Sequence, residues 1–75
     1  MDKDVSELVA RLCTVAGMIM EDVLPMALVR PSDLAETDVN LATLRQAGSD
    51  ITALAGAAAV VARRGRLREM AESGR

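Results

Sequence analysis

The sequence contains no histidine and no aromatic residue, and cysteine occurs only once. Without histidine, no imidazole is present to act as a general base, to activate a nucleophile or to bind a metal. A single cysteine excludes a disulfide within one chain, and one thiol does not make a zinc site. The absence of aromatic residues also removes the rings on which nucleic-acid bases stack. We therefore expect no catalytic residue, no cofactor and no metal.

The chain is short but rich in apolar residues. It has 75 residues, of which 51% are hydrophobic, and its net charge is −2. This composition is too apolar for a disordered chain. A domain of this length, however, buries a small share of its surface and usually needs a disulfide, a metal or oligomerisation. We therefore expect the chain to associate with itself, most simply as a homodimer, or with another protein.

No segment is expected to cross a membrane. The longest uncharged run is the twelve residues 51–62, whereas a spanning helix needs about 20 apolar residues. The first residues, "MDKDVSEL", are acidic where a secretory signal would be basic. Together with the lone cysteine, this predicts a cytoplasmic protein.

Apolar residues recur at helical spacing from Val5 onward and predict a helix over about 4–29. Asp4, with Glu7 three residues later, has the pattern of a capping box at the start of a helix. Pro25 removes a backbone donor and predicts a kink near the end of this helix.

A second helix is predicted over about 33–64, after the break at "VRPSD", with Ser32 as its N-cap. Gly65 suits the position just past a helix end, so residues 65–75 are expected to be a fraying or disordered tail. Gly48 and the serine after it could separate two helices. The apolar stripe keeps its phase through Gly48, which favours one helix with a kink there. That stripe consists of Leu34, Leu41, Leu44, Gly48, Ile51, Ala55, Ala58 and Ala62, widened by Leu54 and Val61.

These elements predict an all-α fold. Residues 1–64 form one helical domain, an antiparallel hairpin, and two hairpins complete a four-helix bundle. The charge distribution fits the hairpin, because residues 1–38 carry a net charge of −5 and residues 39–75 a net charge of +3. The arginine-rich end of the second helix would then return to the acidic start of the first, near Asp2, Asp4 and Glu7.

The candidate functional residues form three groups. The residues expected to carry self-association are Leu12, Ile19, Leu41, Leu44, Ile51, Leu54, Ala58 and Val61. Met18 lies on the otherwise polar face of the first helix and is a candidate contact for a partner, whereas Met20 is expected to fill the core. The run "RRGRLR" places Arg63, Arg64, Arg66 and Arg68 where they could contact nucleic acid. Cys13 is interpreted as a small buried hydrophobic residue.

The function that these observations favour is a small protein–protein interaction module, such as an adaptor, a regulator or an assembly subunit. The alternative is a regulator that binds nucleic acid through the arginine cluster. An enzyme is not expected. A shared pocket lined by Arg11 or Arg45 across a dimer interface would be needed to change that expectation.

Overall fold

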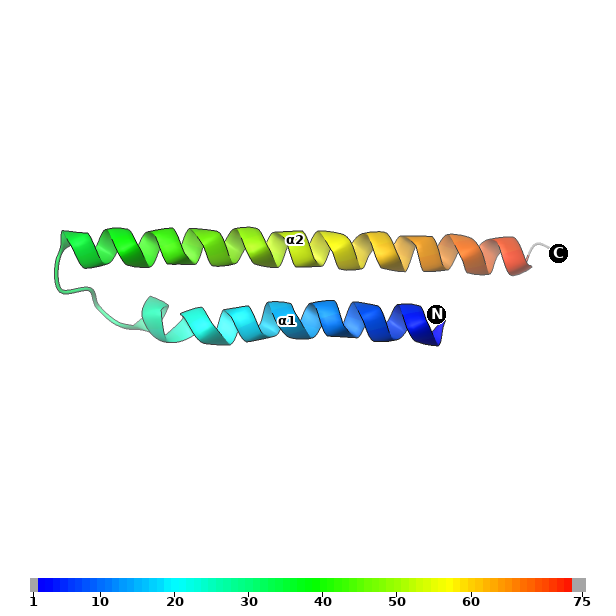
Figure 1. Cartoon of the computed structure of the whole chain (residues 1–75), viewed down its shortest axis with the longest axis horizontal. Helices are drawn as coiled ribbons and strands as arrows, with labels where there is room; N and C mark the ends of the chain where they lie inside the picture. The colour runs from blue at the N-terminus through cyan, green and yellow to red at the C-terminus, as the bar shows by residue number, and fades with distance from the viewer. Residues whose placement is uncertain (1, 74–75) are drawn as a thin grey trace.

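A computed structural model describes residues 2–73, which form two antiparallel helices joined by a short linker (Figure 1). Helix α1 is Lys3–Leu28 and helix α2 is Leu34–Ser73. The all-α hairpin predicted from the sequence is confirmed, and no residue of 2–73 lies in a strand.

The molecule is a thin rod. Its principal axes measure 64 × 15 × 12 Å and its radius of gyration is 17.7 Å, whereas a compact domain of this length would have a radius of about 11 Å. The rod is long because α2 has 40 residues, and an α-helix rises about 1.5 Å per residue. Two helices alone therefore make the whole fold, without a third layer to cover them.

Helix α1 is capped by Asp2 rather than by the predicted Asp4. The Asp2 carboxylate accepts a hydrogen bond from the Asp4 backbone N–H at 2.9 Å, and the helix begins at Lys3. Pro25 lies inside the helix, which ends at Leu28. In Figure 1 the last turn of α1 departs from the line of the rest of the helix, as a proline ring predicts.

Helix α2 is capped by Asp33, so the predicted cap at Ser32 is wrong by one residue. The Asp33 carboxylate accepts a hydrogen bond from the Glu36 backbone N–H at 2.7 Å. The Glu36 carboxylate in turn accepts one from the Ser32 backbone N–H at 2.9 Å. The first bond satisfies one donor that a helix start leaves free, and the second ties the linker to the first turn of α2.

The predicted kink at Gly48 is wrong, since α2 runs straight through this residue as a single helix (Figure 1). Gly48 has an ordinary negative φ, and no described glycine adopts a positive one. Side chains also bridge the position. The Thr52 hydroxyl donates to the Gly48 carbonyl at 2.8 Å, and the Gln46 amide donates to the Asp50 carboxylate at 2.9 Å.

The predicted end of the second helix at residue 64 is also wrong. Helix α2 continues to Ser73, so residues 65–73 are helical rather than a fraying tail, and residues 74–75 lie outside the described part. Gly65 is buried inside the helix, where a Cβ would lie only 2.9 Å from Cγ1 of Val5. The glycine therefore permits a close approach between the helices instead of ending one of them.

Two contacts fix the register of the hairpin. Arg68 lies 3.9 Å from Asp2, and Gly65 lies against Val5, so residues whose numbers add up to about 70 face each other. The residues buried between the helices then recur at alternating spacings of three and four, as in a coiled coil. We call this line the seam. Its members are Val5, Val9, Leu12, Ala16, Ile19, Val23 and Met26 in α1, and Leu44, Ala47, Ile51, Leu54, Ala58, Val61 and Gly65 in α2.

Along much of the seam a small residue faces a large one. In this register Ala58 faces Leu12, while Ala16 faces Leu54. The buried residues are all small, namely Ala16, Ala47, Ala58 and Gly65. Within residues 2–73 no side chain is completely enclosed. Small residues let the two backbones approach closely, but they supply little apolar area, so the hairpin has a thin core.

Candidate self-association surface

Most residues predicted to carry self-association lie in the seam of one chain. Leu12, Ile19, Leu44, Ile51, Leu54, Ala58 and Val61 are buried or half-buried there. Leu41 is the exception, because it lies on the surface and is 53% exposed. The apolar stripe predicted for the second helix combined residues of the seam with residues of an adjacent line. The alternation of spacings three and four separates the seam from the adjacent line through Leu41, Gly48 and Ala55, which is exposed.

One side of the seam is charged. Asp22 of α1 and Asp50 of α2 line the same open groove, together with Thr43. Their heptad positions immediately precede the seam. This line also holds Glu36 and Arg64, together with the uncharged residues Leu8, Val15 and Ala57. We call this side the charged flank. Charged residues are the usual occupants of such positions in coiled coils, where they remain in water.

The other side of the seam has no charge along most of its length. We call it the uncharged flank and define it as Cys13, Met20 and Ala27 in α1 and Leu41, Gly48, Ala55 and Ala62 in α2. Six of the seven are exposed, and Ala62 is half-buried. In helical bundles a third apolar position in each heptad, beside the two of the seam, faces a further helix. The uncharged flank has this pattern, although nothing within one chain covers it.

Two side chains of the uncharged flank, Cys13 and Met20, are more exposed than the sequence predicts. Cys13 is exposed, and Met20 is 52% exposed, although both were expected to be packed inside. The methionine that does lie in the seam is the half-buried Met26. Apolar periodicity alone could not separate these positions, since the seam and the flank are adjacent and similar in composition.

Met18 lies on the opposite side of α1 and is 57% exposed, so the structure places this candidate partner contact on the surface. Exposed Leu8 and Val15 lie on the same side. Arg11 and Asp22 also lie there, so charges interrupt this apolar patch. Its role in binding a partner stays a prediction.

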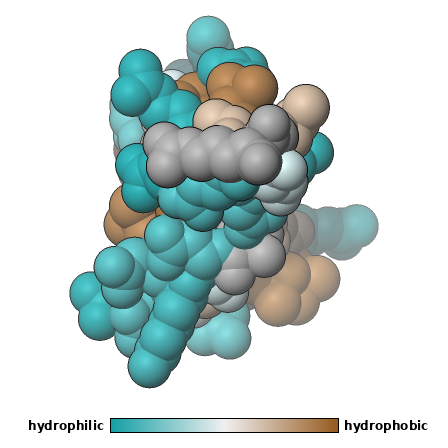
Figure 2. Space-filling model, turned by 90° about the vertical axis from the view of Figure 1, so that its right-hand side faces the viewer, coloured by the Kyte–Doolittle hydropathy of each residue, from teal (hydrophilic) through white to brown (hydrophobic). Residues whose placement is uncertain are grey.

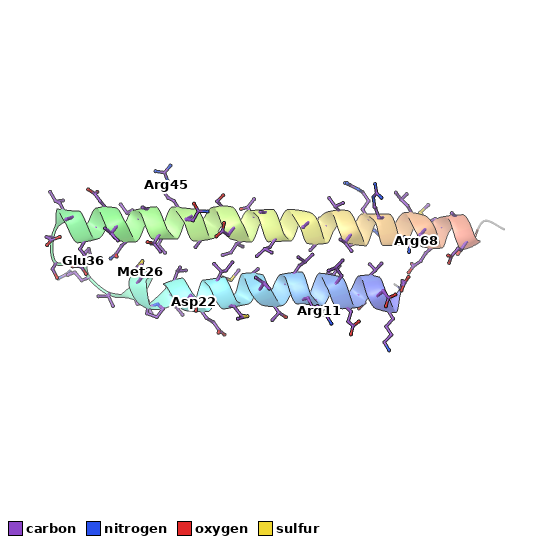
Figure 3. The ribbon with its side chains drawn as sticks, in the orientation of Figure 1. Arg11, Asp22, Met26, Glu36, Arg45 and Arg68 are labelled. Atoms are coloured by element: carbon purple, nitrogen blue, oxygen red, sulfur yellow. The ribbon has the colours of Figure 1, made fainter. Side chains whose placement is uncertain are left out.

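The four arginines of the predicted nucleic-acid site are all exposed, at the end of the rod that Figure 2 shows to be mostly hydrophilic. Arg68 reaches back to the start of α1 (Figure 3) and lies 3.9 Å from Asp2. Both side chains are exposed, 67% for Arg68 and 40% for Asp2, so this ion pair contributes little to stability. Successive residues of a helix point about 100° apart, so Arg63, Arg64, Arg66 and Arg68 spread around α2 instead of forming one line along which a phosphate backbone could lie.

The arginines proposed for a shared pocket do not lie together in the hairpin. Arg11 is on α1, and Arg45 projects from the side of α2 that faces away from α1 (Figure 3). Among residues 2–73 no group of three acidic or cysteine side chains could hold a metal ion. Neither of the two described helices has a stretch long and apolar enough to span a membrane.

Comparisons with known proteins give no relative from which a role could be transferred. No protein-family model matches the sequence, and no curated protein or solved structure is significantly similar to it. The functional argument therefore rests on the surface of the hairpin.

Proposed function

We propose that the protein is a small homo-oligomeric interaction module, in which two hairpins pair into a four-helix bundle. The bundle would act as an adaptor, a regulator or an assembly subunit, without catalytic chemistry of its own. The observation that carries this proposal is the uncharged flank, an apolar line that runs along both helices and faces solvent in one chain.

The surface area of the hairpin supports pairing. Its accessible surface is 5931 Å², whereas a compact monomer of 7.9 kDa would expose about 4,400 Å². The excess of about 1,500 Å² is larger than the area of about 800 Å² that each partner buries in a typical stable interface. A second hairpin could therefore cover a standard interface and still leave ample surface for another protein.

The proposed bundle also supplies the buried apolar area that the single hairpin lacks. The buried residues of the seam are all small, whereas the larger seam residues are only half-buried. A two-helix unit with so thin a core is only marginally stable. Pairing would turn the uncharged flank into a third core line and would bury larger side chains such as Met20, Leu24 and Leu41, which are exposed in one chain. Folding and association would then be coupled.

Sedimentation equilibrium over a wide range of protein concentrations tests the proposal. We expect a molar mass of two chains at high concentration and a melting temperature that rises with concentration, because only the dimer gains the additional burial. A mass of one chain at every concentration, with a melting temperature that does not change, would contradict the proposal.

A further inference from the structure

We propose that a second copy of the chain docks antiparallel on the uncharged flank, with the two-fold axis of the dimer passing near Thr52. The acidic start of α2 in one copy then lies beside the arginine-rich end of α2 in the other. This inference rests on the proposed self-association and adds the face and the orientation of the second copy.

The face is chosen by its lack of charge. The line of residues outside the uncharged flank is uncharged only in part: it holds Gly17 and Leu24 in α1 and Thr52 and Ala59 in α2, all except half-buried Gly17 exposed, and in α2 it also carries Asp38, Arg45 and Arg66. Gly48 is open, since a Cβ placed there would meet nothing within 4 Å. The uncharged flank and the uncharged members of the line beside it can therefore be covered by another helix without burying an ionised group of their own, so desolvation costs little along them.

The orientation is chosen by the charge of the two halves of the rod. The half next to the linker, residues 16–54, carries six acidic and two basic residues, a net charge of −4. The described residues of the other half, 2–15 and 55–73, carry five acidic and six basic residues, a net charge of +1. A parallel dimer would bring the two −4 halves together, whereas an antiparallel dimer pairs each of them with a weakly positive half.

One pair of side chains locates the axis. Asp38 lies two heptads before Thr52 and Arg66 lies two heptads after it, so all three share one line along α2, and both charged side chains are exposed. A two-fold axis at Thr52 therefore brings Asp38 of one copy opposite Arg66 of the other, and it does so twice in the dimer. The register of the hairpin places Thr52 across from Met18, near the middle of α1. Both pairs of helices therefore overlap along most of their length.

Charge reversal tests the orientation. We expect Asp38→Arg alone and Arg66→Asp alone each to weaken the homodimer about tenfold, because two attractive pairs become repulsive. The chain that carries both substitutions, and an equimolar mixture of the two single variants, should recover the affinity of the original dimer. The matched control is Arg64→Asp, which changes the charge equally on the charged flank and should leave the dissociation constant within twofold.

Steric substitution tests the face. Ala55→Gln places a longer side chain on the uncharged flank, and Ala57→Gln places the same side chain on the other side of α2; both alanines are exposed in one chain. We expect Ala55→Gln to weaken the dimer by at least tenfold and Ala57→Gln to have little effect. Circular dichroism should show equal helix content for the two variants at concentrations at which both are dimeric.

The outcomes separate this inference from the proposed function. If the chain is a dimer but neither the charge reversals nor Ala55→Gln changes its dissociation constant, the face and orientation are wrong while self-association stands. If the single reversals weaken the dimer and the mixture does not recover, the antiparallel orientation is wrong. If the unchanged chain is monomeric at every concentration, both proposals are wrong.

Discussion

At the scale of single residues, the glycines of α2 occupy two different environments. Gly65 is pressed against Val5, with only 2.9 Å from its ideal Cβ position to Val5 Cγ1. Gly56 has open space at the same point. The same amino acid therefore stabilises the hairpin at one position, where it permits the contact, and weakens the helix at the other, where it adds only backbone freedom.

We predict opposite effects for the two alanine substitutions. Gly56→Ala should raise the free energy of unfolding by about 0.5–1 kcal/mol, because alanine loses less backbone entropy in a helix. Gly65→Ala should lower it by about 1 kcal/mol, since the β-branched Val5 is stiff and the helices must separate. Urea unfolding measures both. Val5→Ala in the Gly65→Ala background should recover part of the loss, and equal stabilisation at both glycines would contradict the contact.

At the scale of the elements, the start of α2 depends on one carboxylate. Asp33 accepts the Glu36 backbone N–H at 2.7 Å, whereas Ser32 takes part through its own backbone N–H, which a substitution would keep. We predict that Asp33→Ala lowers the free energy of unfolding by about 1 kcal/mol and that Ser32→Ala changes it by only a few tenths. Thermal unfolding followed by circular dichroism compares them. A larger loss of stability for Ser32→Ala than for Asp33→Ala would show instead that Ser32 is the N-cap, as the sequence predicted.

The helices themselves could be predicted from the sequence because they depend on local signals. Apolar spacing and the break at Pro31 are visible without tertiary structure, and the two-helix hairpin follows from them. The end of α2 could not be predicted in the same way. A glycine that ends a helix and a glycine that admits a neighbouring helix look identical in sequence, and only the contact of Gly65 with Val5 distinguishes them.

The candidate surface was predicted less well than the fold. Seven of the eight residues expected to join two chains hold one chain together instead, because the hairpin uses the strongest apolar line for its own seam. Leu41 alone lies on the exposed side. Sequence periodicity shows how much apolar surface a helix has, but it does not say which part the chain covers itself.

At the scale of the whole molecule, Cys13 is a reporter of association that needs no substitution. Its thiol is exposed in one chain and belongs to the uncharged flank, which the proposed dimer covers. We predict that the rate of its alkylation by iodoacetamide falls several-fold as the protein concentration rises through the dissociation constant, because only the monomer exposes the thiol.

The control for this experiment moves the thiol to the opposite side of α1. In a chain with Cys13→Ser and Met18→Cys, the reacting side chain lies on a surface that the proposed dimer leaves open. Its alkylation rate should not depend on protein concentration. If both thiols react at concentration-independent rates while sedimentation shows a dimer, the second copy covers a different face.

The alternation of small and large residues across the seam also limits how the two helices can slide. If α1 moved one heptad toward the linker end of α2, Leu12 would meet Ile51 and Ile19 would meet Leu44, while Ala16 would meet Ala47. Bulky pairs would then hold the helices apart at the very places where the alanine pair needs them close, leaving a void. The sizes of the facing side chains thus set the alignment of the two helices independently of the length of the linker. A chain with residues inserted between the helices should still close in the same alignment.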